Sequence, residues 1–169
     1  IANILLLGSG TVFDVSQVPF FENIYDMVMN NFLPFIADDV KMKIVSGRWA
    51  TDPANKSIVP MMIVANHAPE AVRQELTKAI LDTIKGYESN YQTPSKTGRA
   101  SDYPIYVDEL QAFWSYAEEL QYEPMKQSYN RFFPAMDRML HKYKELTVGI
   151  GMTSSRISSF EAISGAGLT

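Results

Sequence analysis

The sequence predicts an α/β fold, with a mainly parallel β-sheet and helices on both of its faces. The 169 residues are 46% apolar and 20% charged, which is enough for one domain with a core. Apolar segments of strand length alternate with longer segments of helical apolar spacing. Such alternation is typical of parallel sheets. No repeat or linker interrupts the pattern, so we expect residues 1–169 to form a single α/β domain.

The expected strands are short apolar or alternating segments. They lie at residues 2–7, 40–47, 57–65, 104–109 and 146–155. Pro60 lies inside the third of these, which favours an edge strand or a bulge over a central strand.

The expected helices have apolar residues three and four positions apart. They lie at residues 20–35, 69–86, 110–122 and 130–145, and the tail at 156–169 is helix-like before it becomes glycine-rich. The clearest is 69–86, where Pro69 suits a first turn and Gly86 suits a C-terminal cap.

Composition excludes several functional classes. The chain has no cysteine, which excludes disulfides, thiolate catalysis and cysteine-ligated zinc. A net charge of −4 argues against a dedicated polyanion-binding protein but leaves room for a local basic patch. No apolar run approaches the roughly 20 residues that span a bilayer. Because the chain begins with Ile1, we expect a processed protein or an excerpt of a longer one.

Asp108 and Glu109 are the first candidates for chemistry, because they directly follow the apolar residues 105–107. Nucleotide hydrolases place a carboxylate for Mg²⁺ at such a strand end, and a following Glu can polarise the attacking water. The alternative is that Asp108 caps the next helix while Glu109 favours its dipole.

Other motifs are weaker. "GSGT" at residues 8–11 follows an expected strand, but no Gly-Lys pair completes a phosphate loop, so a turn is expected there. His67 and His141 lie in different elements, and G-x-S-x-G is absent. Five basic residues cluster within 14 positions and form either a phosphate contact or a solvated face. They are Arg131, Arg138, His141, Lys142 and Lys144, of which Arg138, His141 and Lys142 share a face if the segment is helical.

The order of these segments resembles the second half of the motor domain in the FtsK/HerA superfamily, and most closely the conjugative type IV secretion ATPases. The resemblance covers about residues 57–165, with "YPIYVDELQAF" similar to a Walker B strand and "HKYKELTVGIGMTSS" similar to a basic helix followed by the sensor strand. It implies a RecA-like fold that binds ATP and Mg²⁺ and drives translocation of DNA or protein. The phosphate loop, called Walker A, is missing.

The resemblance also implies roles for four residues. Asp108 would bind Mg²⁺, Glu109 would activate water, Ser154 would lie near the γ-phosphate sensor position, and Arg138 would act on a neighbouring subunit's nucleotide. The family has Gln where Ser154 stands, which puts phosphate sensing in doubt. The implied partners are further copies of the chain, nucleic acid or secretion and assembly proteins, with a cytoplasmic location.

Two other interpretations remain open from the sequence. The chain could be a structural subunit of a virion, tail or connector-like oligomer, in which case it would be located in a virion. It could instead be a nucleotide-binding or small-ligand-binding domain that has lost catalysis. The ATPase interpretation requires Asp108 and Glu109 at the carboxyl edge of a central parallel strand, facing a crevice.

Overall fold

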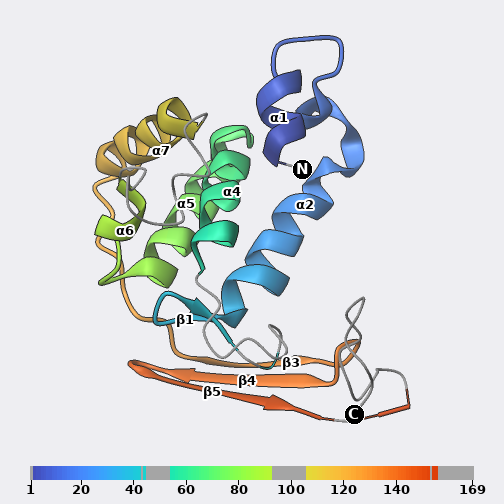
Figure 1. Cartoon of the computed structure of the whole chain (residues 1–169), viewed down its shortest axis with the longest axis vertical. Helices are drawn as coiled ribbons and strands as arrows, with labels where there is room; N and C mark the ends of the chain where they lie inside the picture. The colour runs from blue at the N-terminus through green and yellow to red at the C-terminus, as the bar shows by residue number, and fades with distance from the viewer. Residues whose placement is uncertain (1, 43, 45–53, 93–105, 153, 156–169) are drawn as a thin grey trace, which may run out of the picture.

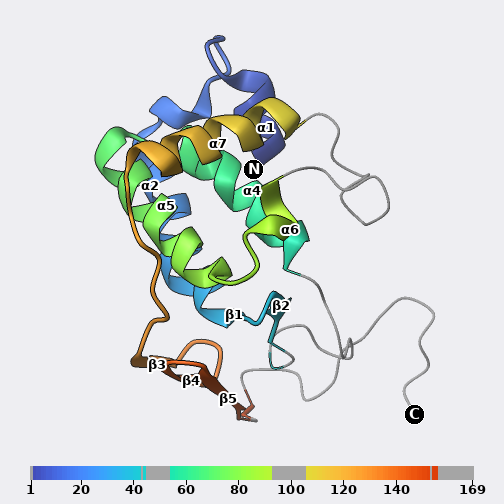
Figure 2. The ribbon, with the colours of Figure 1, turned by 90° about the vertical axis from the view of Figure 1, so that its left-hand side faces the viewer.

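A layer of helices lies over a small antiparallel sheet in the computed structural model (Figures 1 and 2). The structure describes residues 2–42, 44, 54–92, 106–152 and 154–155. The N-terminal helices and those at 55–119 form the upper layer of Figure 1, and the last three strands form the lower layer.

The helical layer has six α-helices among the described residues, one of them a single turn, joined to short 3-10 and π turns. The α-helices are α1 (Ala2–Gly8), α2 (Glu22–Met27), α4 (Asn55–Asn66), α5 (Glu70–Ile84) and α7 (Val107–Glu119), with the one-turn helix α6 (Ser89–Gln92) beside them. The short turns are η1 (Val15–Gln17), η2 (Pro19–Phe21), the π-helical η3 (Val28–Phe32) and η4 (Leu33–Phe35). The helices predicted at 20–35, 69–86 and 110–122 are therefore confirmed.

Helix α4 lies at the centre of this layer and packs against α1, α5 and α7. Its apolar side chains Ile58, Met62 and Ile63 are fully buried, and the stripes of α5 and α7 meet them through residues such as Ile80 and Phe113. A helix that is apolar on all sides is expected at such a position, because neighbours cover every side of it.

Five strands form two antiparallel sheets in the described part of the chain. One pairs β1 (Ile36–Ala37) with β2 (Val40–Lys41), and the other has the order β3 (Tyr129–Phe133), β4 (Arg138–Tyr143) and β5 (Leu146–Gly151). The predicted parallel sheet with helices on both faces is wrong. Within each sheet the strands follow one another through turns of two to four residues, and parallel neighbours need crossover connections of a dozen residues or more.

Three predicted strands are wrong for a shared reason. Residues 2–7 belong to α1, and residues 57–65 belong to α4 with Pro60 inside it. Of the segment 104–109, residues 107–109 form the start of α7 and Tyr106 is its N-cap. A short continuous apolar run fits a buried helix as well as a buried strand, because neither exposes a polar face. Residues 104 and 105 lie outside the described residues.

The helix predicted at 130–145 is wrong as well, because this segment forms the hairpin of β3 and β4. Its side chains alternate between the two faces of the sheet, with Phe133 and Leu140 buried and Phe132 and Met139 exposed. The strand predicted at 146–155 is confirmed as β5 over Leu146–Gly151, and that at 40–47 is confirmed as β2 over Val40–Lys41. Residues 43, 45–47 and 153 lie outside the described residues. The tail at 156–169 lies outside the described residues.

Two sets of contacts hold the sheet against the helices. Phe35, from the turn before β1, packs against Phe133 with ring centroids 4.5 Å apart, and Leu140 completes this small core. The buried carboxylate of Asp82 in α5 accepts hydrogen bonds from the Tyr122 hydroxyl, the Met125 backbone N–H and the Gln127 amide. These bonds fix the segment that leads from α7 to β3.

The helices show no candidate for a membrane span. Within the described ranges, none is both long enough and apolar enough to cross a bilayer.

Candidate functional site

The acidic pair of residues 108 and 109 lies in the first turn of α7, and the structure separates its members. Asp108 is exposed, whereas the Glu109 side chain is 16% exposed and faces the end of α4. Neither residue ends a strand. The alternative derived from the sequence, a helix start with acids beside its positive end, matches this position, although the backbone cap is Tyr106 and not Asp108.

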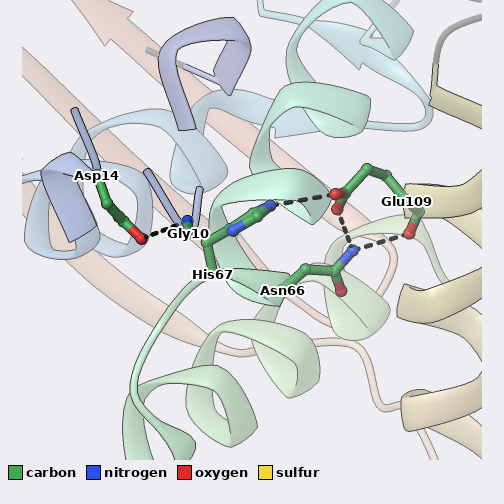
Figure 3. A network of polar contacts seen from close by, with 5 residues as sticks. All are labelled: Gly10, Asp14, Asn66, His67 and Glu109. Carbon is green, nitrogen blue, oxygen red and sulfur yellow. Dashed lines mark hydrogen bonds and ion pairs between the residues drawn. The ribbon is translucent and has the colours of Figure 1, made fainter. Parts of the chain in front are cut away.

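Glu109 is the centre of the polar network in Figure 3. One oxygen of its carboxylate lies 3.1 Å from Nε2 of His67, and the other accepts a hydrogen bond of 2.8 Å from the Asn66 amide. The same amide donates to the Glu109 backbone carbonyl at 2.8 Å. These contacts use both carboxylate oxygens.

The network joins two helix ends of opposite polarity. His67 is the C-cap of α4, where the helix dipole favours a cation, and Glu109 lies at the N-terminal end of α7, where it favours an anion. Asp14 lies nearby on the loop after α1, and hydrogen bonds from Ser16 and from the Gly10 backbone lower the pKa of its carboxyl. This arrangement fastens α7 to α4.

Arg138 and Ser154 lie in the sheet layer and are brought together around Asp137. The Arg138 guanidinium donates to the backbone carbonyls of Ile44, Met136, Asp137 and Met152. The Ser154 hydroxyl donates to the buried Asp137 carboxylate. Arg138 thus fastens loop backbone around the β3–β4 turn.

The roles of these residues toward ATP and Mg²⁺ are not tested by their positions and stay predictions. Arg138 lies in β4 and Ser154 bonds to the adjacent Asp137, whereas Asp108 and Glu109 lie in α7. Figure 1 shows β4 and α7 in different layers. Within the described ranges, no three acidic or histidine side chains gather in a way that could hold a metal ion.

A different site lies where the helices meet the sheet. A cavity of about 140 Å³ opens between α5, the turns η3 and η4, strand β1 and the helix-facing side of β3, β4 and β5. Four cationic side chains line it, together with three acidic ones and the ring of Tyr129. The cations are Lys126, Arg131, Lys142 and Lys144, and the acids are Asp38, Asp82 and Glu145.

Lys142 is the unusual group in this cavity. Its ammonium donates to the Ile36 backbone carbonyl at 3.0 Å and lies 5.9 Å from the centre of the Tyr129 ring. Burial, and then repulsion from Lys126, lower the pKa of Lys142 from 10.5 to about 8. No carboxylate of the described residues lies within 4.0 Å of this ammonium.

Arg131 is the second cation on this side of the sheet. It donates to the Asn30 side chain at 3.0 Å and lies 5.3 Å from the centre of the Tyr129 ring. The nearby acids are engaged elsewhere, because Asp82 accepts three hydrogen bonds and Glu145 pairs with Lys126 at 3.7 Å. Asp38, the third acid of the lining, favours the charged form of Lys142, so the four cations of the cavity outnumber its three carboxylates by one.

The sequence identified part of this site for the wrong structural reason. Arg131, Lys142 and Lys144 belong to the basic cluster noted above, but on a helix Arg138, His141 and Lys142 would share a face. On β4, Arg138 and Lys142 share a face and His141 points the other way. Lys126 and Tyr129 were missed, because the residues YNRFF at 129–133 do not alternate between apolar and polar in a way that would have marked strand β3.

Comparison with known proteins contradicts the ATPase resemblance. No protein-family model matches the chain. A curated relative, the polysaccharide lyase 8 family protein HylA of Enterococcus faecalis, is 28% identical over 178 aligned positions that cover 94% of this chain. The chain spans only 12% of that relative's length.

This likeness overturns the earlier functional interpretation. The FtsK/HerA resemblance is wrong, because the relative is not an ATPase and because the sheets are antiparallel. The predicted ATP binding, translocation and secretion have no support, and neither does the alternative of a virion or connector subunit. The order of segments that suggested a motor domain depended on two expected strands that are helices, at 57–65 and 104–109, and on an expected helix at 130–145 that is a hairpin.

Proposed function

We propose that this chain is a segment of a polysaccharide-acting protein of the lyase kind, and that the cavity between helices and sheet binds an acidic group of the polysaccharide. The likeness to a polysaccharide lyase supports the choice of ligand. The observation that carries the site is Lys142, a largely buried cation with no carboxylate of the described residues within salt-bridge distance.

A buried ammonium with no carboxylate in direct contact is costly, because burial removes its hydration and Asp38 acts on Lys142 only from a greater distance. Proteins retain such groups where a ligand supplies the missing negative charge. With a pKa of about 8, Lys142 is mostly charged at pH 7 and can pair with a carboxylate or sulfate. Arg131, on the same side of the sheet, offers a second donor of the same sign.

In the reaction of a lyase, the positive charge of Lys142 would stabilise the transition state. Eliminative cleavage of an acidic sugar removes the proton beside the carboxylate, and negative charge builds up on that carboxylate in the transition state. A fixed cation next to the carboxylate lowers the activation barrier, because it stabilises the negative charge that develops there in the transition state. The cavity is thus suited to hold and neutralise the acidic group, whichever residue removes the proton.

Binding of acidic and neutral oligosaccharides, measured by calorimetry at low salt, tests the proposal. We expect binding of acidic oligosaccharides only, and a loss of about 10- to 100-fold in affinity for Lys142→Met, the range of a hydrogen bond to a charged group. Lys78→Met is the matched control, because it removes the same charge from α5 at a position that does not line the cavity. Equal binding of neutral oligosaccharides, or an unchanged affinity in Lys142→Met, would overturn the proposal.

A further inference from the structure

A second hollow lies where the helices meet the sheet, beside the start of α4. It has a volume of about 370 Å³ and lies between the turns η3 and η4, the hairpin of β1 and β2, helix α4 and the turn from β3 to β4. Two phenylalanines, two methionines and an isoleucine make most of its lining apolar. They are Phe32, Phe35, Ile36, Met61 and Met136, and we call this hollow the apolar groove.

The apolar groove is lined by both buried and exposed side chains. Phe35, Ile36 and Met61 are between 2% and 5% exposed, whereas the ring of Phe32 is 49% exposed. Exposed aromatic rings beside buried apolar side chains are typical of grooves in which an amphipathic helix binds. An apolar occupant would remove the Phe32 ring from water and so stabilise this part of the molecule.

The chain leaves the sheet next to the apolar groove. The Ser154 hydroxyl donates a hydrogen bond to the Asp137 carboxylate, and Asp137 directly follows Met136 of the groove lining. Ile157 comes two residues after Ser155, and two extended residues span about 7 Å. The segment after Ser155 therefore begins within reach of the groove.

Residues 157–163 have the apolar spacing of a helix that binds in a groove. Ile157, Phe160 and Ile163 recur at every third position. On a helix, this spacing places the three side chains within an arc of about 120° on one face. Glu161 borders that face, and Lys41 in the groove lining has the opposite charge. The segment thus matches the groove in apolar character and in charge.

Attachment to the same chain favours this segment over a separate partner molecule. A short connection keeps the effective concentration of the segment near the groove at about the millimolar level. A second copy of the chain would have to reach a similar concentration in solution to compete for the groove.

We propose that residues 157–163 bind in the apolar groove, with Phe160 against Phe32 and with Glu161 next to Lys41. The groove shares Ile36 with the cavity of Lys142, and the Ile36 carbonyl accepts the hydrogen bond of the Lys142 ammonium. The bound segment therefore supports the wall of that cavity. This inference requires no ligand and does not rest on the proposed function.

Disulfide formation tests this proposal, because the 169 residues contain no native cysteine. The pair Phe160→Cys and Phe32→Cys is introduced into the native full-length protein, with any cysteine elsewhere replaced by serine. The control pairs Phe160→Cys with Phe13→Cys, because Phe13 is an exposed ring on the loop after α1 that does not line the groove. We expect the first pair to form a disulfide within one chain about tenfold or more faster than the control, since a disulfide requires Cα atoms about 4–7 Å apart.

Equal rates for the two pairs would overturn the proposal, because the segment would then have no preference for the groove. A disulfide between two chains, seen as a dimer on a non-reducing gel, would also overturn it and assign the groove to a second copy.

A second measurement covers the case in which the paired cysteines weaken the contact. The single variant Phe32→Cys is labelled with a water-soluble maleimide, with and without Phe160→Asp. We expect Phe160→Asp to speed labelling at position 32 about fivefold or more, because a charged side chain is costly to bury in an apolar groove. Labelling of Phe13→Cys should not change. An unchanged rate at position 32 would overturn the proposal.

Discussion

The interior of the helical layer and the junction between the helices and the sheet are packed differently. Between the helices, fully buried apolar residues such as Phe113, Ile80 and Met62 pack against one another. Between the helices and the sheet, three buried residues, Phe35, Phe133 and Leu140, form the core, and charged side chains line the space beside them. The helical layer is organised for stability, whereas the junction keeps a cavity open at a cost in stability. Such a cost is typical of binding sites.

The largest expected effect is in the helical core. Phe113→Ala should lower the free energy of unfolding by about 3–5 kcal/mol, because it removes a fully buried ring and leaves a cavity. Urea unfolding followed by circular dichroism measures this change. Phe132→Ala is the control, because this ring is 57% exposed on the sheet, and a similar loss there would contradict the contrast between the layers.

The next effect concerns the link between the layers. Asp82→Ala should cost about 2–3 kcal/mol, because it leaves the donors of Tyr122, Met125 and Gln127 without their acceptor. Thermal unfolding of this variant and of Asp26→Ala, which removes an exposed carboxylate bonded to Asn30, gives a matched pair. Burial and the Asp82 carboxylate also raise the pKa of Tyr122 to about 12. In Asp82→Ala the ultraviolet titration of this phenol should move back toward pH 10.

The third prediction concerns Lys142 in the cavity. Unlike Phe113 and Asp82, its charged side chain should lower the free energy of unfolding, and by a smaller amount. The folded protein binds the Lys142 proton less tightly than the unfolded chain does, since its pKa falls from 10.5 to about 8. The contribution of Lys142 to stability should therefore rise by about 1–3 kcal/mol as the pH increases from 8 toward 10.5, and be lost as the pH falls through 8. Urea unfolding at pH 7 and pH 9 measures part of this change, because tyrosines with an ordinary pKa of about 10 stay largely protonated at both pH values.

The substitution Lys142→Met separates the effect of this charge on stability from its proposed role in binding. Lys142→Met should gain about 1 kcal/mol at pH 7 while flattening the pH dependence, because it replaces a buried charge with an apolar chain of similar length. Lys78→Met should leave the pH dependence unchanged. A destabilised Lys142→Met variant would indicate that the ammonium is a structural anchor for the Ile36 carbonyl.

The smallest expected effect is at the junction of α4 and α7. Glu109→Gln keeps the size of the side chain but removes its charge next to His67 and the start of α7. We expect a loss of about 1 kcal/mol, the value of a partly exposed charge pair at helix ends. Thermal unfolding measures it, with the exposed neighbour Asp108→Asn as the control. A loss as large as that of Phe113→Ala would mean that the network is part of the core.

The sequence predicted the long amphipathic helices well and the short apolar segments poorly. Helix α5 could be found because Val72, Leu76 and Ile80 repeat at helical spacing between Pro69 and Gly86, which has φ +90°. Helix α4 could not, since its apolar residues are continuous and reveal no period. The hairpins were missed because their turns place Asp137 and Lys144 at positive φ, where glycine or asparagine would have been a clearer signal.

The candidate site was predictable only in its residue types. The basic cluster at residues 131–144 is visible in the sequence, but its partners are not. Lys142 lies beside Ile36, 106 positions earlier in the chain, and Arg131 lies beside Asn30. Glu109 was singled out for a metal-dependent role, yet its partners are Asn66 and His67 on another helix.

The sequence by itself determined the amphipathic helices such as α5, the absence of cysteine and the concentration of cations at residues 131–144. These are local properties, set by residue type and spacing over a few turns. Tertiary structure alone decided that 130–145 is a hairpin, that its cations face the helices, and that its apolar residues face away. Those outcomes depend on strand register, which a shift of one residue would invert, and on contacts between residues more than 90 positions apart.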